Sequence, residues 1–335
     1  ATLLAQQNLP KNIEVISSPK KKLLVEIRAA NIKMSKYLLN NKNYLMAFSK
    51  KILEVINTNV INFCGKRHFY TAINVFSQNR QEDTSRETHF GFETVKEDEK
   101  AEKVYSVFEN VANKYDVMND TMSFGVHRVW KDIFVQRLGP TSDTKLLDVA
   151  GGTGDIAFRF LKYLQLEGTT TGKVTVCDIN DAMLEVGRAR ANKLGFPDSN
   201  IDWLQGDAEQ LPVEDSAYTA YTIAFGIRNV THIDRALKEA YRVLKPGGRF
   251  MCLEFSHLNN NVLQWMYDQY SFQVIPVMGQ LIAGQWKPYQ YLVESIRQFP
   301  NQEDFKSMIE DAGFSHVEYE NLTFGVVAIH SAFKL

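Results

Sequence analysis

Cysteine is scarce in this sequence of 335 residues, and the three present, Cys64, Cys177 and Cys252, stand far apart. Their spacing matches neither a disulfide framework nor a metal site, so a reducing compartment is favoured over secretion and no metal is predicted. Apolar runs of about 18 residues are also absent, and we expect no segment to span a membrane. The sequence also has no large excess of positive or negative charge, since its net charge is -1 at pH 7. This balance disfavours a nucleic-acid partner.

Acidic residues are rare in one further place, the stretch between Met34 and Gln81. It holds seven basic residues against one acid, Glu54, with apolar residues interspersed. Such a composition is typical of a cleavable organellar presequence, and a disordered basic tail is the alternative. The rest of the chain has the composition of a globular protein, and the whole is 44% hydrophobic and 23% charged.

These differences divide the chain into three parts. We expect a presequence or disordered region over 1–85, a polar linker over 86–100, and one domain over 101–335. Because the sequence opens with alanine, Met34 is a candidate initiator, with 1–33 translated upstream of it.

Strand-like and helix-like patterns alternate along the predicted domain. The strand candidates are Lys145–Ala150, Lys173–Asp178, Ile201–Gln205, Tyr218–Ala224, Arg249–Phe255, His316–Leu322 and Gly325–Phe333. The helix candidates are Asp155–Gln165, Ala182–Leu194, His232–Val243 and Gln302–Ala312. Alternation of this kind predicts an α/β fold with a mostly parallel sheet and helices on both faces. The short turn between the last two strands adds an antiparallel edge.

A glycine-rich turn follows the first strand in LLDVAGGTGDIAFRF. Gly151, Gly152 and Gly154 let the backbone approach a ligand closely at the carboxyl end of the strand, where doubly wound sheets bind ligands. By itself the turn also fits a dinucleotide enzyme or a plain tight turn. Asp148 before it and Asp155 after it oppose a pyrophosphate and suit a sulfonium or ammonium ligand such as S-adenosylmethionine.

Two further acids end the next strands. Asp178, in VTVCDIN, can bind two ribose hydroxyls, and Asp207, in GDAEQLP, can accept from an adenine amino group. Each alone could be a helix cap or a solvated loop residue. Four acids around the strand ends together favour a nucleoside cofactor, and they disfavour an NAD-dependent oxidoreductase.

Several segments of the sequence match those of a known protein family. They are VFENVANKYDVMNDTMSFGVHRVWKD (107–132), LLDVAGGTGDIAFR (146–159), VCDIN (176–180), GDAEQLP (206–212), AFGIRNV (224–230), LKPGGRFMCLEFS (244–256) and YQYLVESIRQFP (289–300). With them the chain resembles class I S-adenosylmethionine-dependent methyltransferases, and within these the ubiquinone/menaquinone C-methyltransferase family. The chain departs from the family pattern at Gln285 and Pro288, where an acid and a small residue are expected.

The resemblance implies a Rossmann-like class I methyltransferase fold, with a seven-stranded, mostly parallel sheet containing one antiparallel strand. The implied cofactor is S-adenosylmethionine, bound by Asp148, Gly151, Gly152, Thr153, Gly154, Asp178, Ile179, Asp207 and Ala208. The implied catalytic residues are Arg228, Asn229 and Tyr115.

The implied reaction methylates a ring carbon of a polyprenylated methoxy-benzoquinol in ubiquinone biosynthesis. The ring carbon becomes nucleophilic when the neighbouring phenol, of pKa about 10, ionises. We predict that Arg228, which is a poor base because it stays protonated, stabilises the phenolate and orients a water that takes the proton, with Asn229 orienting ring oxygens or that water. A purely structural ion pair is the alternative for Arg228.

Tyr115 is expected to be either a cation–π partner of the sulfonium or a packed core aromatic. His127 is a lone histidine, and such residues are more often structural, so it stays outside the predicted catalytic set.

Residues 262–283 are aromatic and aliphatic with one charge, and we expect them to cover the substrate cleft and its polyprenyl tail. Core packing or a dimer face is the alternative. The resemblance implies a peripheral protein on the matrix side of the inner mitochondrial membrane, in company with other ubiquinone-biosynthesis proteins, and leaves a homodimer open. Methylation of another quinol such as demethylmenaquinol and a non-catalytic scaffold are the competing functions.

Overall fold

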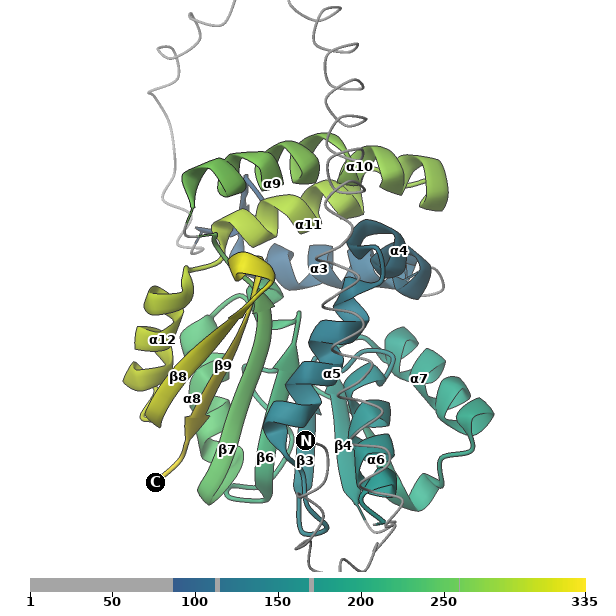
Figure 1. Ribbon diagram of the computed structural model, residues 1–335, viewed down its shortest axis with the longest axis vertical. Helices are drawn as coiled ribbons and strands as arrows, with labels where there is room; N and C mark the ends of the chain where they lie inside the picture. The colour runs from purple at the N-terminus through teal and green to yellow at the C-terminus, as the bar shows by residue number, and fades with distance from the viewer. Residues whose placement is uncertain (1–86, 112–114, 169–171, 259) are drawn as a thin grey trace, which may run out of the picture. The chain divides into compact units, whose positions relative to one another are not determined.

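The computed structural model describes residues 87–111, 115–168, 172–258 and 260–335 (Figure 1). The predicted presequence, with Met34 and Cys64, lies outside the described residues.

One seven-stranded sheet forms the centre of the described chain. Its strands are β3 (Lys145–Val149), β4 (Lys173–Asp178), β5 (Ile201–Gln205), β6 (Tyr218–Ala224), β7 (Leu244–Phe255), β8 (Ser315–Leu322) and β9 (Val327–Phe333). They pair in the order β5-β4-β3-β6-β7-β9-β8, and β9 is antiparallel to both of its neighbours while the other pairs are parallel. The predicted sheet with one antiparallel strand is confirmed.

Helices cover both faces of this sheet because successive strand residues point to opposite sides. Leu146 belongs to a core shared with α5 (Val126–Leu138), α6 (Asp155–Leu166) and α7 (Asp181–Leu194). Leu147, the next residue, belongs to a second core shared with α8 (Ile233–Val243) and α12 (Gln302–Asp311). The four predicted helices are present, whereas α5 was not predicted.

Residues 87–100, within the segment 86–100 that was predicted to be a linker, have regular structure instead, so the prediction is wrong for them. They contain a hairpin, β1 (Glu87–Phe90) and β2 (Glu93–Lys96), and the start of α3 (Glu97–Val111). Apolar residues of this hairpin contact residues far away in the sequence. The Phe90 ring, for example, stacks on the Tyr291 ring with their centroids 4.1 Å apart. Composition alone suggested a linker because these partners are distant in the sequence.

A group of helices, which we call the cap, lies over the carboxyl ends of the strands (Figure 1). It consists of α3, α4 (Tyr115–Ser123), α9 (Asn261–Gln273), α10 (Ile275–Met278), the π-helical turn Gly279–Ala283 and α11 (Lys287–Gln298). Met118, Ile275, Tyr289 and Val293 form its own small apolar core. The apolar segment 262–283 therefore folds as part of a cover over this end of the sheet.

Candidate active site

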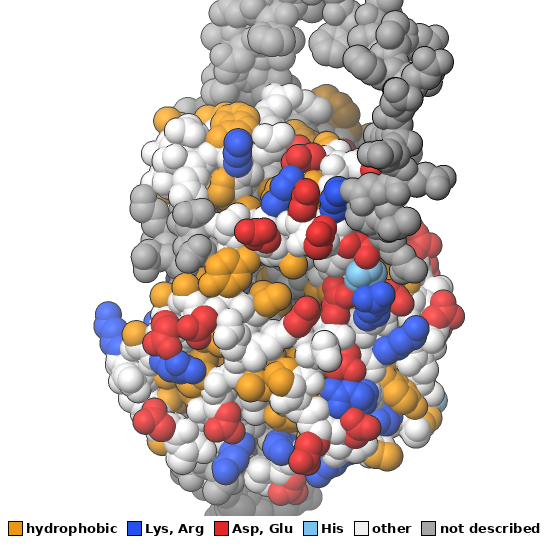
Figure 2. All heavy atoms as spheres, turned by 180° about the vertical axis from the view of Figure 1, so that it is seen from behind, with side chains coloured by type: hydrophobic (Ala, Val, Ile, Leu, Met, Phe, Trp, Pro, Cys, Tyr) orange, Lys and Arg blue, Asp and Glu red, His pale blue; other side chains and the backbone are white. Residues whose placement is uncertain are grey.

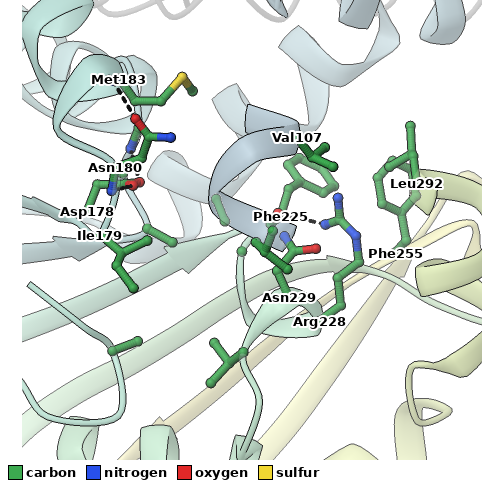
Figure 3. A pocket seen from close by; sticks show the side chains of 18 of the residues that line it. Val107, Asp178, Ile179, Asn180, Met183, Phe225, Arg228, Asn229, Phe255 and Leu292 are labelled. Atoms are coloured by element: carbon green, nitrogen blue, oxygen red, sulfur yellow. Dashed lines mark hydrogen bonds between the residues drawn. The ribbon is translucent and has the colours of Figure 1, made fainter. Parts of the chain in front are cut away.

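A cavity of about 510 Å³ lies between the strand ends and the cap. It brings together most of the predicted site residues, namely Asp148, Gly151, Gly152, Thr153, Asp178, Ile179, Asp207, Ala208, Arg228 and Asn229. Gly154 lies just behind the lining, in the turn itself. Tyr115 begins α4, and its side chain lies outside the described part of the structure. Figure 3 shows Asp178, Ile179 and Met183 on one side of the cavity and Arg228, Asn229 and Phe255 on the other.

The turn after β3 needs its glycines. A Cβ on Gly151 would lie 2.7 Å from Val176 Cγ1 and 2.9 Å from Asp148 Oδ2, too close for any side chain. Gly154 has a φ of 80°, a left-handed conformation that glycine adopts without strain. The backbone therefore passes close to the strand ends and leaves the cavity open above it.

Asp178, at the end of β4, holds two loops of the site. Its Oδ2 accepts a hydrogen bond of 2.8 Å from the Gly152 N–H, and its Oδ1 accepts one of 2.8 Å from the Asn180 N–H. Removal from bulk water raises the pKa of Asp178 to about 6, against the lowering effect of these two hydrogen bonds. The glycine turn and the start of α7 are thereby fixed to each other.

Asp148 is fully buried at the end of β3. Its Oδ1 accepts a hydrogen bond of 2.8 Å from Thr222 Oγ1, whereas its Oδ2 has no partner among the described residues. Burial raises the pKa of Asp148 to about 7, and the nearby carboxylates of Asp155 and Asp178 act in the same direction. An orphaned acceptor beside a glycine turn fits a ligand that brings a donor or a positive charge.

Asp155, the first residue of α6, is already neutralised by cations of the chain. Its Oδ2 lies 2.7 Å from Lys131 Nζ, and its Oδ1 lies 3.3 Å from Arg159 Nε. Although desolvation alone would raise the pKa of Asp155, these cations hold it at about 2. Asp155 lines the cavity, but its charge is balanced by Lys131 and Arg159 before any ligand binds. The sequence pattern gave no sign of Lys131, because α5 was not predicted.

The loop after β5 carries Asp207 and Ala208 into the cavity lining. Asp207 is exposed, and its Oδ1 accepts a hydrogen bond of 2.9 Å from the Glu209 N–H. Glu209, which was not predicted, binds His232 Nδ1 at 2.6 Å, and His232 Nε2 lies 3.1 Å from the Glu97 carboxylate of α3. This chain of contacts ties the cap to the loop that is expected to hold an adenine.

Arg228, in the short 3-10 helix Ile227–Asn229, forms a buried ion pair with Glu254 of β7. Its Nη1 donates to Glu254 Oε1 at 2.8 Å and to the Phe225 carbonyl at 2.6 Å, and the guanidinium carbon lies 5.5 Å from the centre of the Phe255 ring. The ion pair that was left open for Arg228 is present, and Arg228 also lines the cavity. Glu254 was missed, although an acid inside the apolar run MCLEF is a signal for a buried partner.

Asn229 is oriented by the cap. Its Oδ1 accepts a hydrogen bond of 3.0 Å from the Tyr291 hydroxyl of α11, and burial raises the pKa of that hydroxyl well above its usual value. The 3-10 helix that carries Arg228 and Asn229 is thus held from below by β7 and from above by α11.

The described residues lack two other kinds of feature. Among them, no group of three or more His, Cys, Asp or Glu side chains could hold a metal ion. Within the same residues, no helix has the length and apolar character needed to cross a membrane.

Comparison with known proteins defines the class of protein. The model of the ubiE/COQ5 methyltransferase family matches residues 95–334. The mitochondrial 2-methoxy-6-polyprenyl-1,4-benzoquinol methylase of Drosophila melanogaster is 66% identical over 256 residues, covering 74% of this chain and 85% of that protein. The enzyme of the same name from Homo sapiens is 58% identical over 284 residues, covering 76% and 86%. The crystal structure of the [4+2]-cyclase SpnF covers 69% of this chain and 94% of its own, with a TM-score of 0.50 and 16% identity, which is a likeness of fold.

The fold is that of a Rossmann-like class I methyltransferase. The chain belongs to the ubiE/COQ5 methyltransferase family and is a methyltransferase with S-adenosylmethionine as its cofactor. The site fits this group, because Gly151, Gly152 and the strand-end acids line one cavity and the buried Asp148 Oδ2 has no hydrogen-bond partner among the described residues.

Replacing Asp178 by alanine should weaken binding of S-adenosylhomocysteine by about 10- to 100-fold, because the Gly152 and Asn180 N–H groups lose a charged acceptor worth about 1.5–3 kcal/mol. Isothermal titration of the full chain measures this change. Asp198→Ala, an exposed acid away from the cavity, is the control and should bind as the wild type does. Equal affinities for wild type and Asp178→Ala would remove Asp178 from the cofactor site.

Proposed function

We propose that this chain transfers a methyl group from S-adenosylmethionine to a ring carbon of 2-methoxy-6-polyprenyl-1,4-benzoquinol, giving the 5-methoxy-2-methyl-3-polyprenyl product of ubiquinone biosynthesis. One observation carries the proposal: a single cavity joins the glycine turn and its acids to a buried arginine and an apolar wall, in a chain of this family. The names of the relatives supply the quinol.

The strand ends would hold the cofactor, which supplies an electrophilic methyl group when bound. Asp178 would accept from the ribose hydroxyls, and Ile179, 40% exposed at the cavity, would pack against the nucleoside. Asp207 and Ala208 would contact the adenine. Asp148, Gly151, Gly152, Thr153 and Gly154 would surround the amino-acid end.

The other side of the cavity would hold the quinol. Arg228 would donate to the oxygen that becomes a phenolate, and Asn229 would orient a ring oxygen. Because Glu254 already balances the charge of Arg228, the pair lowers the pKa of the phenol less than a lone guanidinium would. Positioning of the ring carbon against the methyl donor then supplies much of the rate acceleration.

The cap would receive the polyprenyl tail. Its cavity-lining side chains are mostly apolar or aromatic, among them Met118, Met122, Tyr270, Ile275, Leu292 and Ile296. A tail of this kind is dissolved in a bilayer, so the cap should face a membrane surface. Apolar residues are exposed on the cap, including Val262 at 67%, Trp265 at 61% and Leu281 at 79%, and Figure 2 shows hydrophobic side chains on this end of the molecule.

We extend the proposal to the place of action. The mitochondrial names of the relatives support a mitochondrial location. The family resemblance alone supports peripheral attachment to the matrix side of the inner membrane and other ubiquinone-biosynthesis proteins as partners, and it leaves a homodimer open.

The proposed reaction is tested by incubating the full chain with S-adenosylmethionine and a short-tailed demethyl benzoquinol kept reduced. We expect mass spectrometry to find one added methyl group on a ring carbon. Demethylmenaquinol, offered in parallel, should be a poorer substrate. Preferred methylation of demethylmenaquinol would assign the other quinol, and cofactor binding without any product would favour the scaffold.

Arg228→Ala should lose both stability and activity, because it leaves the Glu254 charge buried and unpaired at a cost of about 3–5 kcal/mol. The double variant Arg228→Met with Glu254→Gln removes both charges and should recover most of the thermal stability. We expect it to remain at least about 100-fold slower in kcat, as after loss of one donor to a developing oxyanion. A double variant that regains wild-type kcat would show that Arg228 is only a structural partner.

The membrane contact is tested on the cap surface. Trp265→Glu combined with Leu281→Glu should reduce co-sedimentation with liposomes, since two exposed apolar side chains become charged. Leu166→Glu, an exposed leucine at the end of α6, is the matched control. Neither change should alter kcat with a short-tailed, water-soluble quinol, because none of these residues lines the cavity. Liposome binding that survives in the double variant would place the membrane contact elsewhere.

A further inference from the structure

The hairpin β1–β2 is docked on one side of α11. The Phe90 ring stacks on the Tyr291 ring with an interplanar angle of 14°, and the Phe92 N–H donates to Glu294 Oε2 at 3.1 Å. Tyr291 and Glu294 are three residues apart and therefore lie on the same side of the helix. The turn of the hairpin needs Gly91, because its φ is 60° and a Cβ there would collide with the Glu294 carboxylate. A segment that is distant in the sequence thus holds α11 at the position of Tyr291.

The same hairpin is also held by α3. Lys103 Nζ of α3 lies 3.1 Å from Glu93 Oε1 and 5.6 Å from the centre of the Phe90 ring. Phe90 itself does not line the cavity. Any effect of Phe90 on the reaction must therefore pass through a neighbour, and its stacking partner Tyr291 is the neighbour that reaches the site.

Tyr291 connects the hairpin to the cavity. Its side chain is buried, it lines the cavity, and its hydroxyl donates to Asn229 Oδ1 at 3.0 Å. Burial raises the pKa of this hydroxyl well above its usual value, against the lowering effect of Arg228. The hydroxyl therefore keeps its proton at neutral pH and stays a hydrogen-bond donor.

This hydrogen bond determines which end of the Asn229 amide is available to a ligand. A carboxamide has an oxygen that accepts and a nitrogen that donates. The oxygen is used by Tyr291, so Nδ2 is the group that Asn229 can offer to the cavity that it lines, beside Arg228 (Figure 3). A donor at this point suits an oxygen that only accepts, such as a phenolate or a methoxy oxygen.

We propose that Tyr291 is a positioning residue of the methyl transfer: held by the Phe90 stack, it binds Asn229 Oδ1 so that Asn229 Nδ2 donates to an acceptor oxygen of the quinol. The inference rests on the proposed function and deepens it. Arg228 keeps the role proposed for it, and Asn229 supplies a second, oriented donor. No bond forms or breaks at Tyr291, whose proton stays on its hydroxyl. A ring bound by two oriented donors is held in line with the methyl group more of the time.

The experiment compares Tyr291→Phe with Tyr218→Phe in the full chain. Tyr291→Phe removes only the hydroxyl and keeps the ring that stacks on Phe90. We expect kcat for a short-tailed quinol to fall about 3- to 10-fold, as for one neutral hydrogen bond, with unchanged affinity for S-adenosylhomocysteine. Tyr218 is the matched control, since it is equally buried and its hydroxyl donates to Thr175 Oγ1 at 3.1 Å, but it does not line the cavity. Tyr218→Phe should keep the wild-type kcat.

A double-mutant cycle separates a positioning residue from a structural one. Asn229→Ala should lower kcat by at least about 10-fold, because it removes the donor itself. Tyr291→Phe should then cost little more in the Asn229→Ala background, since the amide through which it acts is gone. A tyrosine that only stabilises the fold would lower kcat by the same factor in both backgrounds.

The contribution of the hairpin is tested outside the cavity. Phe90→Leu removes the aromatic stack and should lower kcat about 3-fold, whereas Phe90→Tyr keeps a ring on Tyr291 and should restore most of the rate. Phe92→Leu is the control in the same hairpin, because Phe92 stacks on Phe272 instead, with centroids 6.0 Å apart, and should leave kcat unchanged. All rates are compared at a temperature at which thermal unfolding curves show every variant to be folded.

Failure of this inference differs visibly from failure of the function on which it rests. Near-normal kcat in Tyr291→Phe, an equal loss in Tyr218→Phe, or full additivity with Asn229→Ala overturns the positioning role while methylation by the wild type stands. Weaker cofactor binding with unchanged kcat also overturns it and places Tyr291 at the cofactor. Unchanged kcat in Phe90→Leu overturns the part assigned to the stack. A wild type that methylates no quinol refutes the proposed function and the positioning role with it.

Discussion

The carboxylate of Asp178 binds the backbone of two loops at once, the glycine turn after β3 and the turn before α7. Parallel strands bring their carboxyl ends to one edge of the sheet, but they do not fix the loops that follow. A partly desolvated carboxylate between two N–H groups does so at the cost of a raised pKa. The cavity keeps its shape on the cofactor side because this one group is both a structural clamp and part of the lining.

Two charges of the site are balanced within the chain. Asp155 is matched by Lys131 and Arg159, and Arg228 is matched by Glu254. The lining as a whole is acidic, because seven acids stand against the two cations Lys131 and Arg228. Such a lining suits a cationic methyl donor, whose charge disappears as the product forms, while oriented donors and acceptors position the ring.

The sequence predicted the sheet well, because the central strands β3, β4 and β6 are apolar runs followed by turns, and the boundaries of β4, β5 and β6 agree with the structure. The acids at the strand ends were found for the same reason. What was missed depends on contacts between distant segments. The roles of Glu254, Lys131 and the hairpin at 87–96 can be recognised only once Arg228, Asp155 and α11, their respective partners, are placed beside them. His127 was left outside the catalytic set, and the structure places it in the cavity lining with its Nε2 against Asp120.

The cap is built from segments that lie far apart in the sequence, and the hairpin at 87–96 packs against it. Phe90 stacks on Tyr291, and the Phe92 N–H donates to Glu294, across 202 positions of sequence. Contacts between residues this far apart close long loops, at a larger entropic cost than local contacts. A chain that ended before α11 would contain the strands as far as β7 but not this part of the cover over the cavity. Enclosure of the active site therefore depends on a segment that is synthesised after five of the seven strands of the sheet.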